Sequence, residues 1–137
     1  MYDAMFNRQR DWLILLARIL LMILYVTAGW QKMLGFGGTV GAMAAYGLPI
    51  PTVAAIVVVV IEFLVGIALV IGVWTRPLAL LMAVYTLATA FIGHHYWTMT
   101  GAAYGANFIN FYKNVSIVGG LLLLCVTGAG KYSIDRI

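Results

Sequence analysis

Residues 57–66 read VVVVIEFLVG, and they place one carboxyl group inside an uninterrupted apolar run from Ile50 to Trp74. A run of this length can cross a bilayer as a helix, because the hydrocarbon core takes about 20 residues at about 1.5 Å each. Glu62 then lies near the middle of the membrane. A carboxyl group at that depth is costly, so we expect it to face protein or water and to have a partner.

The composition indicates an integral membrane protein. Of 137 residues, 64% are hydrophobic and only 9% are charged, whereas a soluble domain carries about a quarter charged residues. The net charge of +4 comes from scattered basic residues, which argues against nucleic acid as a partner. The single cysteine, Cys125, excludes a disulfide framework and a C-x-x-C redox pair.

The apolar pattern predicts one domain, residues 1–137, folded as an all-α bundle of four transmembrane helices. The expected spans are Trp12 to Met33, Ile50 to Trp74, Leu78 to about Gly93, and about Asn110 to Ala129. The first span is too long for a signal peptide and has no small-residue cleavage site after it, so we expect it to be retained.

Basic residues predict the orientation, because cytoplasmic loops are richer in Lys and Arg. Five of them fall on one side of the four-span arrangement and two on the other. The first group is Arg8, Arg10, Arg76, Lys131 and Arg136, and the second is Lys32 and Lys113. We therefore expect both termini in the cytoplasm.

The connections contain further signals. Residues 42–46, AMAAY, predict a short helix on the outer surface, ended by Gly47 and Pro49. Between spans two and three, Thr75 is expected to cap the third helix and Pro77 to lie in its first turn. The third connection, HHYWTMTGAAYGANFINFYKN, is polar and aromatic, and we expect it on the outer side.

Five residues of span one share a helical face, because they recur at spacings of three and four. They are Arg18, Met22, Tyr25, Gly29 and Lys32, and this is the polar face of the span. Arg18 is deep enough for its side chain to extend towards Glu62. Two interpretations of such a pair stay open. One is a structural clamp with Gly66 allowing close helix approach, which we place slightly ahead. The other makes Glu62 a ligand-binding or proton-handling group in a cavity.

The outer side carries the remaining candidate ligand-binding residues. His94 and His95 are adjacent, so at most one of them faces the bundle interior, and no set of metal ligands is predicted. Asn107, Asn110 and Asn114 form a polar stripe beside Lys113 if the segment is helical. Lys32 and Lys113 are expected to reach lipid phosphates or, alternatively, to frame a pocket above Glu62. The candidate wall residues are Tyr25, Tyr85, Phe91, Phe108 and Phe111.

The whole pattern resembles the DoxX family of small four-helix membrane proteins, in particular its short inner-membrane members. The residues that carry the resemblance are Gly29 with Lys32, GFGGTV, Glu62, TRPLA at 75–79, IGHHYWTMTG, INFYKNVSI and the final TGAGKYSIDR. The resemblance implies a location in the cytoplasmic membrane and a link to quinone-dependent electron transfer or oxidative-stress complexes. It supplies no catalytic residues.

Two functions are therefore expected. The first is a quinone-interacting component of a membrane redox system, with quinone as the only candidate cofactor and with electrons from another subunit, since this chain has no redox motif. The second is a noncatalytic scaffold that binds lipid or partner subunits, including copies of itself. A transporter is less favoured, because four spans without a repeat offer little machinery for alternating access.

Overall fold

The computed structural model describes all of residues 1–137 and is entirely helical, as predicted. Four helical segments are long and apolar enough to cross a membrane: Tyr2–Leu34, Pro51–Ile71, Thr75–Thr98 and Gly101–Thr127. The elements are α1 (Tyr2–Leu34), α2 (Phe36–Ala45), α3 (Pro51–Val59), the π-helix η1 (Val60–Val65), α4 (Gly66–Ile71), α5 (Thr75–Gly93), the 3-10 turn η2 (Tyr96–Thr98) and α6 (Gly101–Thr127).

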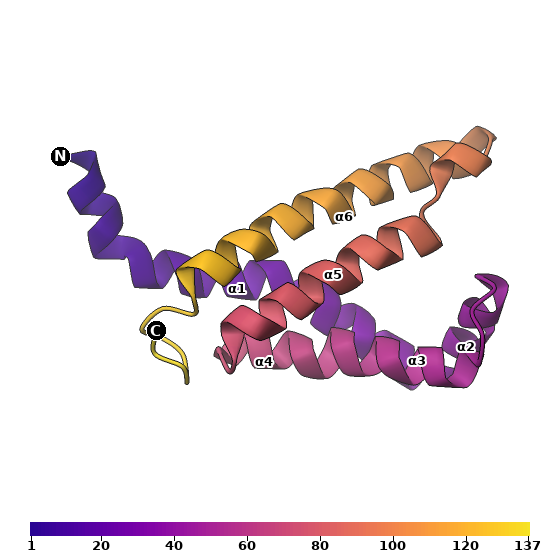
Figure 1. Cartoon of the computed structure of the whole chain (residues 1–137), viewed down its shortest axis with the longest axis horizontal. Coiled ribbons are helices and arrows are strands. Elements are labelled where there is room, and N and C mark those ends of the chain that lie inside the picture. The colour runs from indigo at the N-terminus through magenta and orange to yellow at the C-terminus, as the bar shows by residue number, and fades with distance from the viewer.

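The helices form two hairpins that are joined along part of their length (Figure 1). α1 packs on the continuous α3, η1 and α4 segment, and α6 packs chiefly on α5. Both termini lie at one end of the molecule, which we call the inner end, and α2 lies at the opposite, outer end (Figure 1). The two hairpins meet over a core that contains the fully buried Met22, Leu69, Met82 and Leu121.

Three helix starts differ from the sequence prediction, and the first is that of α1, which begins at Tyr2 rather than at Trp12. The fourth span begins at Gly101 rather than near Asn110, so only residues 94–100 connect α5 to α6. The glycines and polar groups of residues 101–109 resembled a loop, but no proline interrupts them. The outer helix α2 was predicted, yet it begins at Phe36 and so includes GFGG residues. The Thr39 hydroxyl ties it to α1 by donating to the Lys32 carbonyl at 2.9 Å.

Arg18 does not pair with Glu62, so the predicted contact between them is wrong. Its guanidinium donates to the carbonyls of Leu69 (3.3 Å) and Val70 (2.5 Å) and to that of Tyr132 in the C-terminal segment. The carbonyls in the last turn of α4 have no partner within the helix and carry the negative end of its dipole. Arg18 therefore closes the inner end of α4, and extension of its side chain in that direction takes it away from Glu62.

The C-terminal segment also caps α5. The carboxylate of Asp135 accepts from the backbone N–H groups of Trp74 (2.9 Å) and Thr75 (2.8 Å). The predicted capping by the Thr75 hydroxyl is wrong, since that buried oxygen has no hydrogen-bond partner. Partial burial acts to raise the pKa of Asp135, but the N–H donors of Thr75 and Trp74 and the charge of Arg18 outweigh it, and the pKa is lowered.

Close helix contact depends on Gly29. A Cβ atom at this position would lie 2.7 Å from the backbone nitrogen of Phe63, which cannot move without disturbing η1. Gly66, the position singled out in the sequence, meets α1 less tightly, at 3.1 Å from a methyl group of Val26. Gly29 on α1, more than Gly66 on α4, therefore allows α1 to approach the Glu62 segment closely.

Candidate functional site

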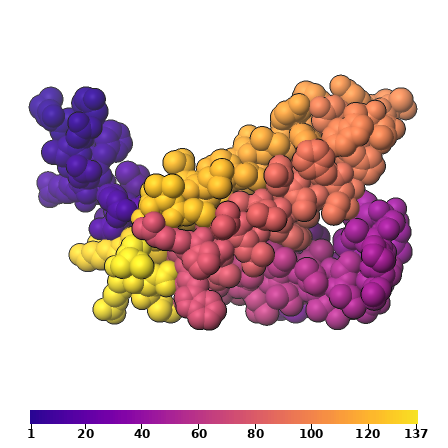
Figure 2. Space-filling model, in the orientation of Figure 1, coloured from indigo at the N-terminus to yellow at the C-terminus, as the bar shows by residue number.

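A cavity of about 680 Å³ lies between the two hairpins in the outer half of the molecule. The surface is hollowed there, between α2 and α3 on one side and α5 and α6 on the other (Figure 2). Most of the wall is apolar or small, with contributions from α1, α2, α3 and α5. These lining residues include Leu24, Ala28, Ala42, Met43, Leu48, Val57, Val58, Ala88 and Ile92. A cavity of this size is typical of a small-molecule site.

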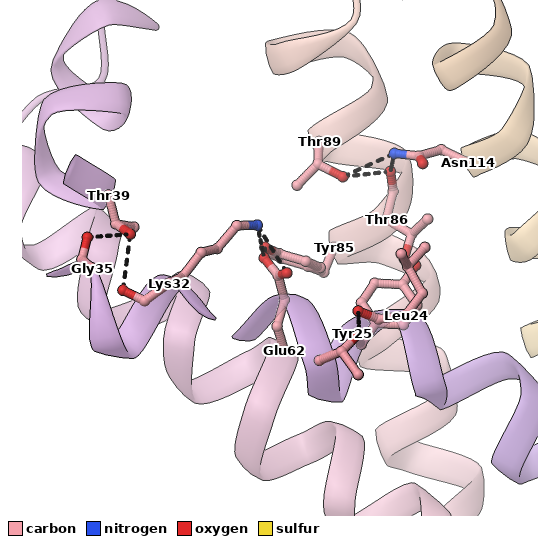
Figure 3. A network of polar contacts seen from close by, with 11 residues as sticks. Leu24, Tyr25, Lys32, Gly35, Thr39, Glu62, Tyr85, Thr86, Thr89 and Asn114 are labelled. Carbon is pink, nitrogen blue, oxygen red and sulfur yellow. Dashed lines mark hydrogen bonds and ion pairs between the residues drawn. The ribbon is translucent and has the colours of Figure 1, made fainter. Parts of the chain in front are cut away.

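Glu62 lies in this cavity wall and is only 3% exposed. Lys32 Nζ donates to both of its carboxylate oxygens, at 2.9 and 2.7 Å, and the Tyr85 hydroxyl donates to Oε2 at 2.5 Å (Figure 3). The expectation that Glu62 faces protein and has a partner is confirmed. Its partner is Lys32, at the outer end of α1. The Glu62 Oε2 atom accepts two hydrogen bonds, one from Lys32 and one from Tyr85.

Lys32 turns into the bundle instead of reaching lipid phosphates. Its side chain extends from the last turn of α1 to Glu62 (Figure 3). This direction follows from the strong attraction of a buried carboxylate in a poorly solvated region. The Lys32 side chain remains 39% exposed while that of Glu62 is 4% exposed, so the pair offers its positive member to the cavity.

The local backbone at Glu62 is a π-helix. The N–H of Gly66 bonds to the carbonyl of Ile61, five residues earlier, where an α-helix would use the fourth. Such single-turn expansions occur frequently at functional sites. Here the expansion covers Val60–Val65 and therefore contains Glu62, on the side where Gly29 lets α1 approach.

A second polar group lies on the wall opposite Glu62 and joins α1, α5 and α6. The hydroxyls of Tyr25 and Thr86 are 2.5 Å apart. The buried Asn114 amide donates to the Thr86 carbonyl and to the Thr89 hydroxyl, both at 3.2 Å (Figure 3). Tyr25, Thr89 and Asn114 line the cavity, so this hydrogen-bonded group presents polar atoms next to an otherwise apolar wall.

The outer part of the lining contains Lys113 and His94. His94 Nδ1 lies 2.8 Å from Asn107 Oδ1, and the exposed Lys113 makes one long hydrogen bond, 3.4 Å, to Asn110 Oδ1. His95 points elsewhere, with Nδ1 3.0 Å from the Ile92 carbonyl, and does not line the cavity. The prediction that no more than one of the two histidines faces inward agrees with this arrangement.

The nine candidate residues are thus divided. Six line the cavity: Tyr25, Lys32, Glu62, His94, Lys113 and Asn114. Asn110 only contacts Lys113, and Arg18 and His95 lie outside. Among the proposed aromatic walls, Tyr25 and Tyr85 line the cavity. Phe91, Phe108 and Phe111 do not. The longer α6 carries Phe108 and Phe111 into an aromatic cluster around Tyr96, at ring-centroid distances of 4.9 Å and 5.6 Å, and Phe91 of α5 packs on Phe111 at 5.2 Å.

Sequence reasoning missed Thr89 and Gln31, which also line the cavity. Thr89 follows Tyr85 and Thr86 at helical spacing, so a polar face of α5 was visible in the sequence. Gln31 gave no comparable signal. The cavity therefore combines a neutral ion pair, hydroxyl and amide groups, and one weakly held cation, Lys113. Such a set can orient a mostly apolar ligand through a few hydrogen bonds.

Comparison with known proteins gives consistent matches. The DoxX family model matches residues 13–95. Over 131 residues the chain is 53% identical to the inner membrane protein YphA of Escherichia coli K12, covering 96% of this chain and 94% of that protein. It is also 45% identical over 127 residues to the inner membrane protein YqjF of the same organism, covering 90% of each. No solved structure matches.

Proposed function

Since this chain belongs to the DoxX family and is a multi-pass inner-membrane protein, we propose that its outer cavity binds a quinone. In this proposal the protein is the quinone-interacting subunit of a membrane redox or oxidative-stress system. Both termini are cytoplasmic, following the excess of Arg and Lys at the inner end. The single observation that carries the proposal is the buried Glu62–Lys32 pair in the wall of a cavity between membrane-spanning helices.

The lining suits a quinone head group. A quinone ring is flat and apolar apart from two carbonyl oxygens, which only accept hydrogen bonds. The cavity offers donors at separate places on an apolar wall, namely the ammonium groups of Lys32 and Lys113. Its position between the hairpins also gives an isoprenoid chain a short path to the surrounding lipid.

The Tyr85–Glu62–Lys32 group suits proton transfer. Reduction of a quinone to a quinol takes up two electrons and two protons. The three side chains form a continuous hydrogen-bonded row that ends at the half-exposed ammonium of Lys32. Side chains of these types can act as general acids and bases when they lie within hydrogen-bonding distance of the reacting group. Electrons are supplied by a membrane partner, because the chain contains one cysteine and no metal-binding cluster.

Binding of a short-chain quinone to the purified protein tests the proposal. Decylubiquinone is titrated into the protein in detergent, and the dissociation constant and the melting temperature are measured. We expect saturable binding that Tyr85→Phe weakens about tenfold, because loss of its hydrogen bond to Glu62 disturbs the carboxylate that positions the Lys32 ammonium. The matched control is Tyr112→Phe, since Tyr112 is exposed and lies outside the cavity. Absence of saturable binding in the wild type contradicts the proposal.

A lipid-binding scaffold is the second candidate, and a separate feature favours it. A groove of about 490 Å³ between α1 and α6 is lined almost entirely by apolar residues, including Leu13, Leu20 and Leu123. It can hold an acyl chain. Mass spectrometry of molecules extracted from the purified protein distinguishes the two candidates. Stoichiometric quinone supports the first, whereas stoichiometric phospholipid without quinone supports the second.

A further inference from the structure

The N-terminal part of α1 extends beyond the membrane-spanning bundle. At 33 residues the helix is about 50 Å long, while the hydrocarbon core is about 30 Å thick. Arg18 is level with the last turn of α4, because it bonds to the carbonyl of Val70. Residues 2–11 therefore lie past the inner end of the neighbouring span, and each of residues 1–10 is exposed.

This extension is amphipathic. At 100° per residue, Tyr2, Met5 and Phe6 fall within one sector, while Asp3 and Arg10 fall on the other side together with Asn7 and Asp11. The three large apolar side chains are 70%, 57% and 55% exposed, respectively. A helix end that only had to be dissolved in water would not need its apolar residues on one side.

The apolar side leads, with Gln9 as the one polar residue in between, into the outward-facing apolar surface of the same helix. Leu13, Leu16 and Leu20 follow in the same sector and are 47%, 52% and 60% exposed. In a membrane-spanning helix, exposed leucines of this kind contact acyl chains. The stripe beginning at Tyr2 thus leads into the exposed apolar surface of a membrane-spanning helix, which points to lipid as the material that covers it.

The direction of the N-terminal extension agrees with contact between its apolar side and lipid. The N-terminal part of α1 bends away from the bundle and runs across the long axis along which the spans are aligned (Figure 1). Around the bend, the C-terminal segment holds the polar side of α1. The backbone N–H of Lys131 donates to Asp11 Oδ1 at 2.9 Å, and the rings of Trp12 and Tyr132 are 4.4 Å apart.

We propose that residues 2–11 form an in-plane anchor that lies on the membrane surface at the inner end, with Tyr2, Met5 and Phe6 inserted at the boundary of head groups and acyl chains. The partner is the lipid surface itself. Within the segment the charges of Asp3 and Asp11 balance those of Arg8 and Arg10. Apolar burial therefore drives the contact, and it does not require anionic lipid.

Spin labelling of the full chain tests this anchor. In a Cys125→Ser background, single labels are placed at Met5→Cys, Phe6→Cys, Asn7→Cys and Asp3→Cys, and the protein is reconstituted in phosphatidylcholine nanodiscs. Accessibility to oxygen, which concentrates in lipid, and to a water-soluble nickel chelate is measured by electron paramagnetic resonance. We expect labels at 5 and 6 to favour oxygen at least threefold over labels at 3 and 7.

Other outcomes overturn the proposal. Equal nickel accessibility at all four positions means that the helix stands free in water. Shielding of positions 5 and 6 from both reagents means that protein covers this face, and dipolar broadening would identify a second copy as that protein.

Two further measurements sharpen the result. Phe6→Asp is expected to reduce the oxygen accessibility at position 5 at least twofold, whereas the matched change Asn7→Asp on the polar side leaves it unaltered. Adding about a third of phosphatidylglycerol to the nanodiscs is expected to leave the pattern of the parent protein unchanged. A pattern that appears only with anionic lipid contradicts the apolar driving force.

Discussion

Arg18 and Glu62 are both buried charges within spans of one small bundle, and they are satisfied in opposite ways. Arg18 is fully buried and donates to three backbone carbonyls at the inner end. Glu62 is bonded only by side chains, Lys32 and Tyr85, and borders a cavity of about 680 Å³. Backbone groups hold Arg18 in a fixed position, whereas the partners of Glu62 can change rotamer.

The difference separates a structural charge from a candidate functional one. Carbonyls in the last turn of α4 and in the C-terminal segment exist whether or not a ligand is present, so the protein itself supplies the partners of both terminal nitrogens of Arg18, and only Nε is left buried without one. The Glu62 site contains a half-exposed ammonium and a tyrosine hydroxyl that a ligand can contact. An ion pair inside a protein is by itself weak evidence for stability. The cavity that the Glu62–Lys32 pair borders is therefore the stronger indication of its role.

The largest expected effect is that of Lys32→Met, which leaves the Glu62 carboxylate buried without its cation. Removing one partner of a fully buried pair costs about 3–5 kcal/mol. Because the Lys32 side chain is 39% exposed, we expect a loss at the lower end of that range in the free energy of unfolding, measured by SDS titration in mixed micelles. The double variant Lys32→Met/Glu62→Leu should recover most of it. Lys113→Met is the control and should change stability by less than about 0.5 kcal/mol, because Lys113 is exposed. Equal effects of both lysine variants would contradict our view of the pair.

The next effect concerns the contact that brings α1 to the Glu62 segment. Gly29→Ala places a Cβ atom 2.7 Å from the Phe63 nitrogen, so the helices must separate, at an expected cost of about 1–3 kcal/mol. Gly119→Ala is the matched control, since no atom lies within 4 Å of the new Cβ, and it should be neutral or slightly stabilising. Thermal unfolding of both variants in one detergent provides the measurement, and a Gly29→Ala protein as stable as the control refutes the close contact.

Asp135 tests the inner end, where the expected effect is smaller. Asp135→Asn weakens the cap of α5, and we expect a loss of about 0.5–1 kcal/mol at pH 7, reduced by the partial solvent exposure of the carboxylate. The folded-state pKa of Asp135 is lowered, so its stabilisation is present above the unfolded value of about 3.9 and is lost as the pH falls through the lower folded value. The stability difference between wild type and variant should therefore shrink towards zero in acid. A difference that stays constant from pH 6 to pH 2 argues against the cap.

The smallest effect compares neighbouring histidines. His94→Gln removes a side chain from the cavity lining and should weaken decylubiquinone binding by about two- to tenfold, the range of one net hydrogen bond. His95→Gln is the control and should leave the affinity unchanged, because His95 lies outside the lining. Identical affinities for the two variants would remove His94 from the proposed site without affecting the stability comparison above.

Much of the architecture was predictable from apolar run lengths. The four spans and the burial of Glu62 follow from the hydrocarbon thickness and the high cost of a charge inside it. The outer helix α2 follows from the run AMAAY before Gly47 and Pro49. The start of α6 was not predictable in this way. Residues 101–109 are rich in Gly, Ala and aromatic residues, and their helical state depends on packing against α5 that a single sequence does not display.

The partner of Glu62 was harder to predict than its burial. Both Arg18 and Lys32 lie on the polar face of α1, and depth in the membrane alone favoured Arg18. The choice depends on the C-terminal segment, whose Tyr132 carbonyl and Asp135 charge attract Arg18 to the inner end. Contacts between residues more than 100 positions apart gave no signal in the sequence, and neither did the π-helix at Val60–Val65.

That π-helix makes the direction of the Glu62 carboxylate depend on chain length as well as on residue type. One extra residue is accommodated within Val60–Val65, and each residue turns a helix by about 100°. Removing a single valine from this run would leave its composition almost unchanged, yet it would rotate the carboxylate relative to Gly66 and α4. When relatives are aligned through this run, a one-residue gap should therefore be treated as a change of the cavity lining, on a par with replacing the acid itself.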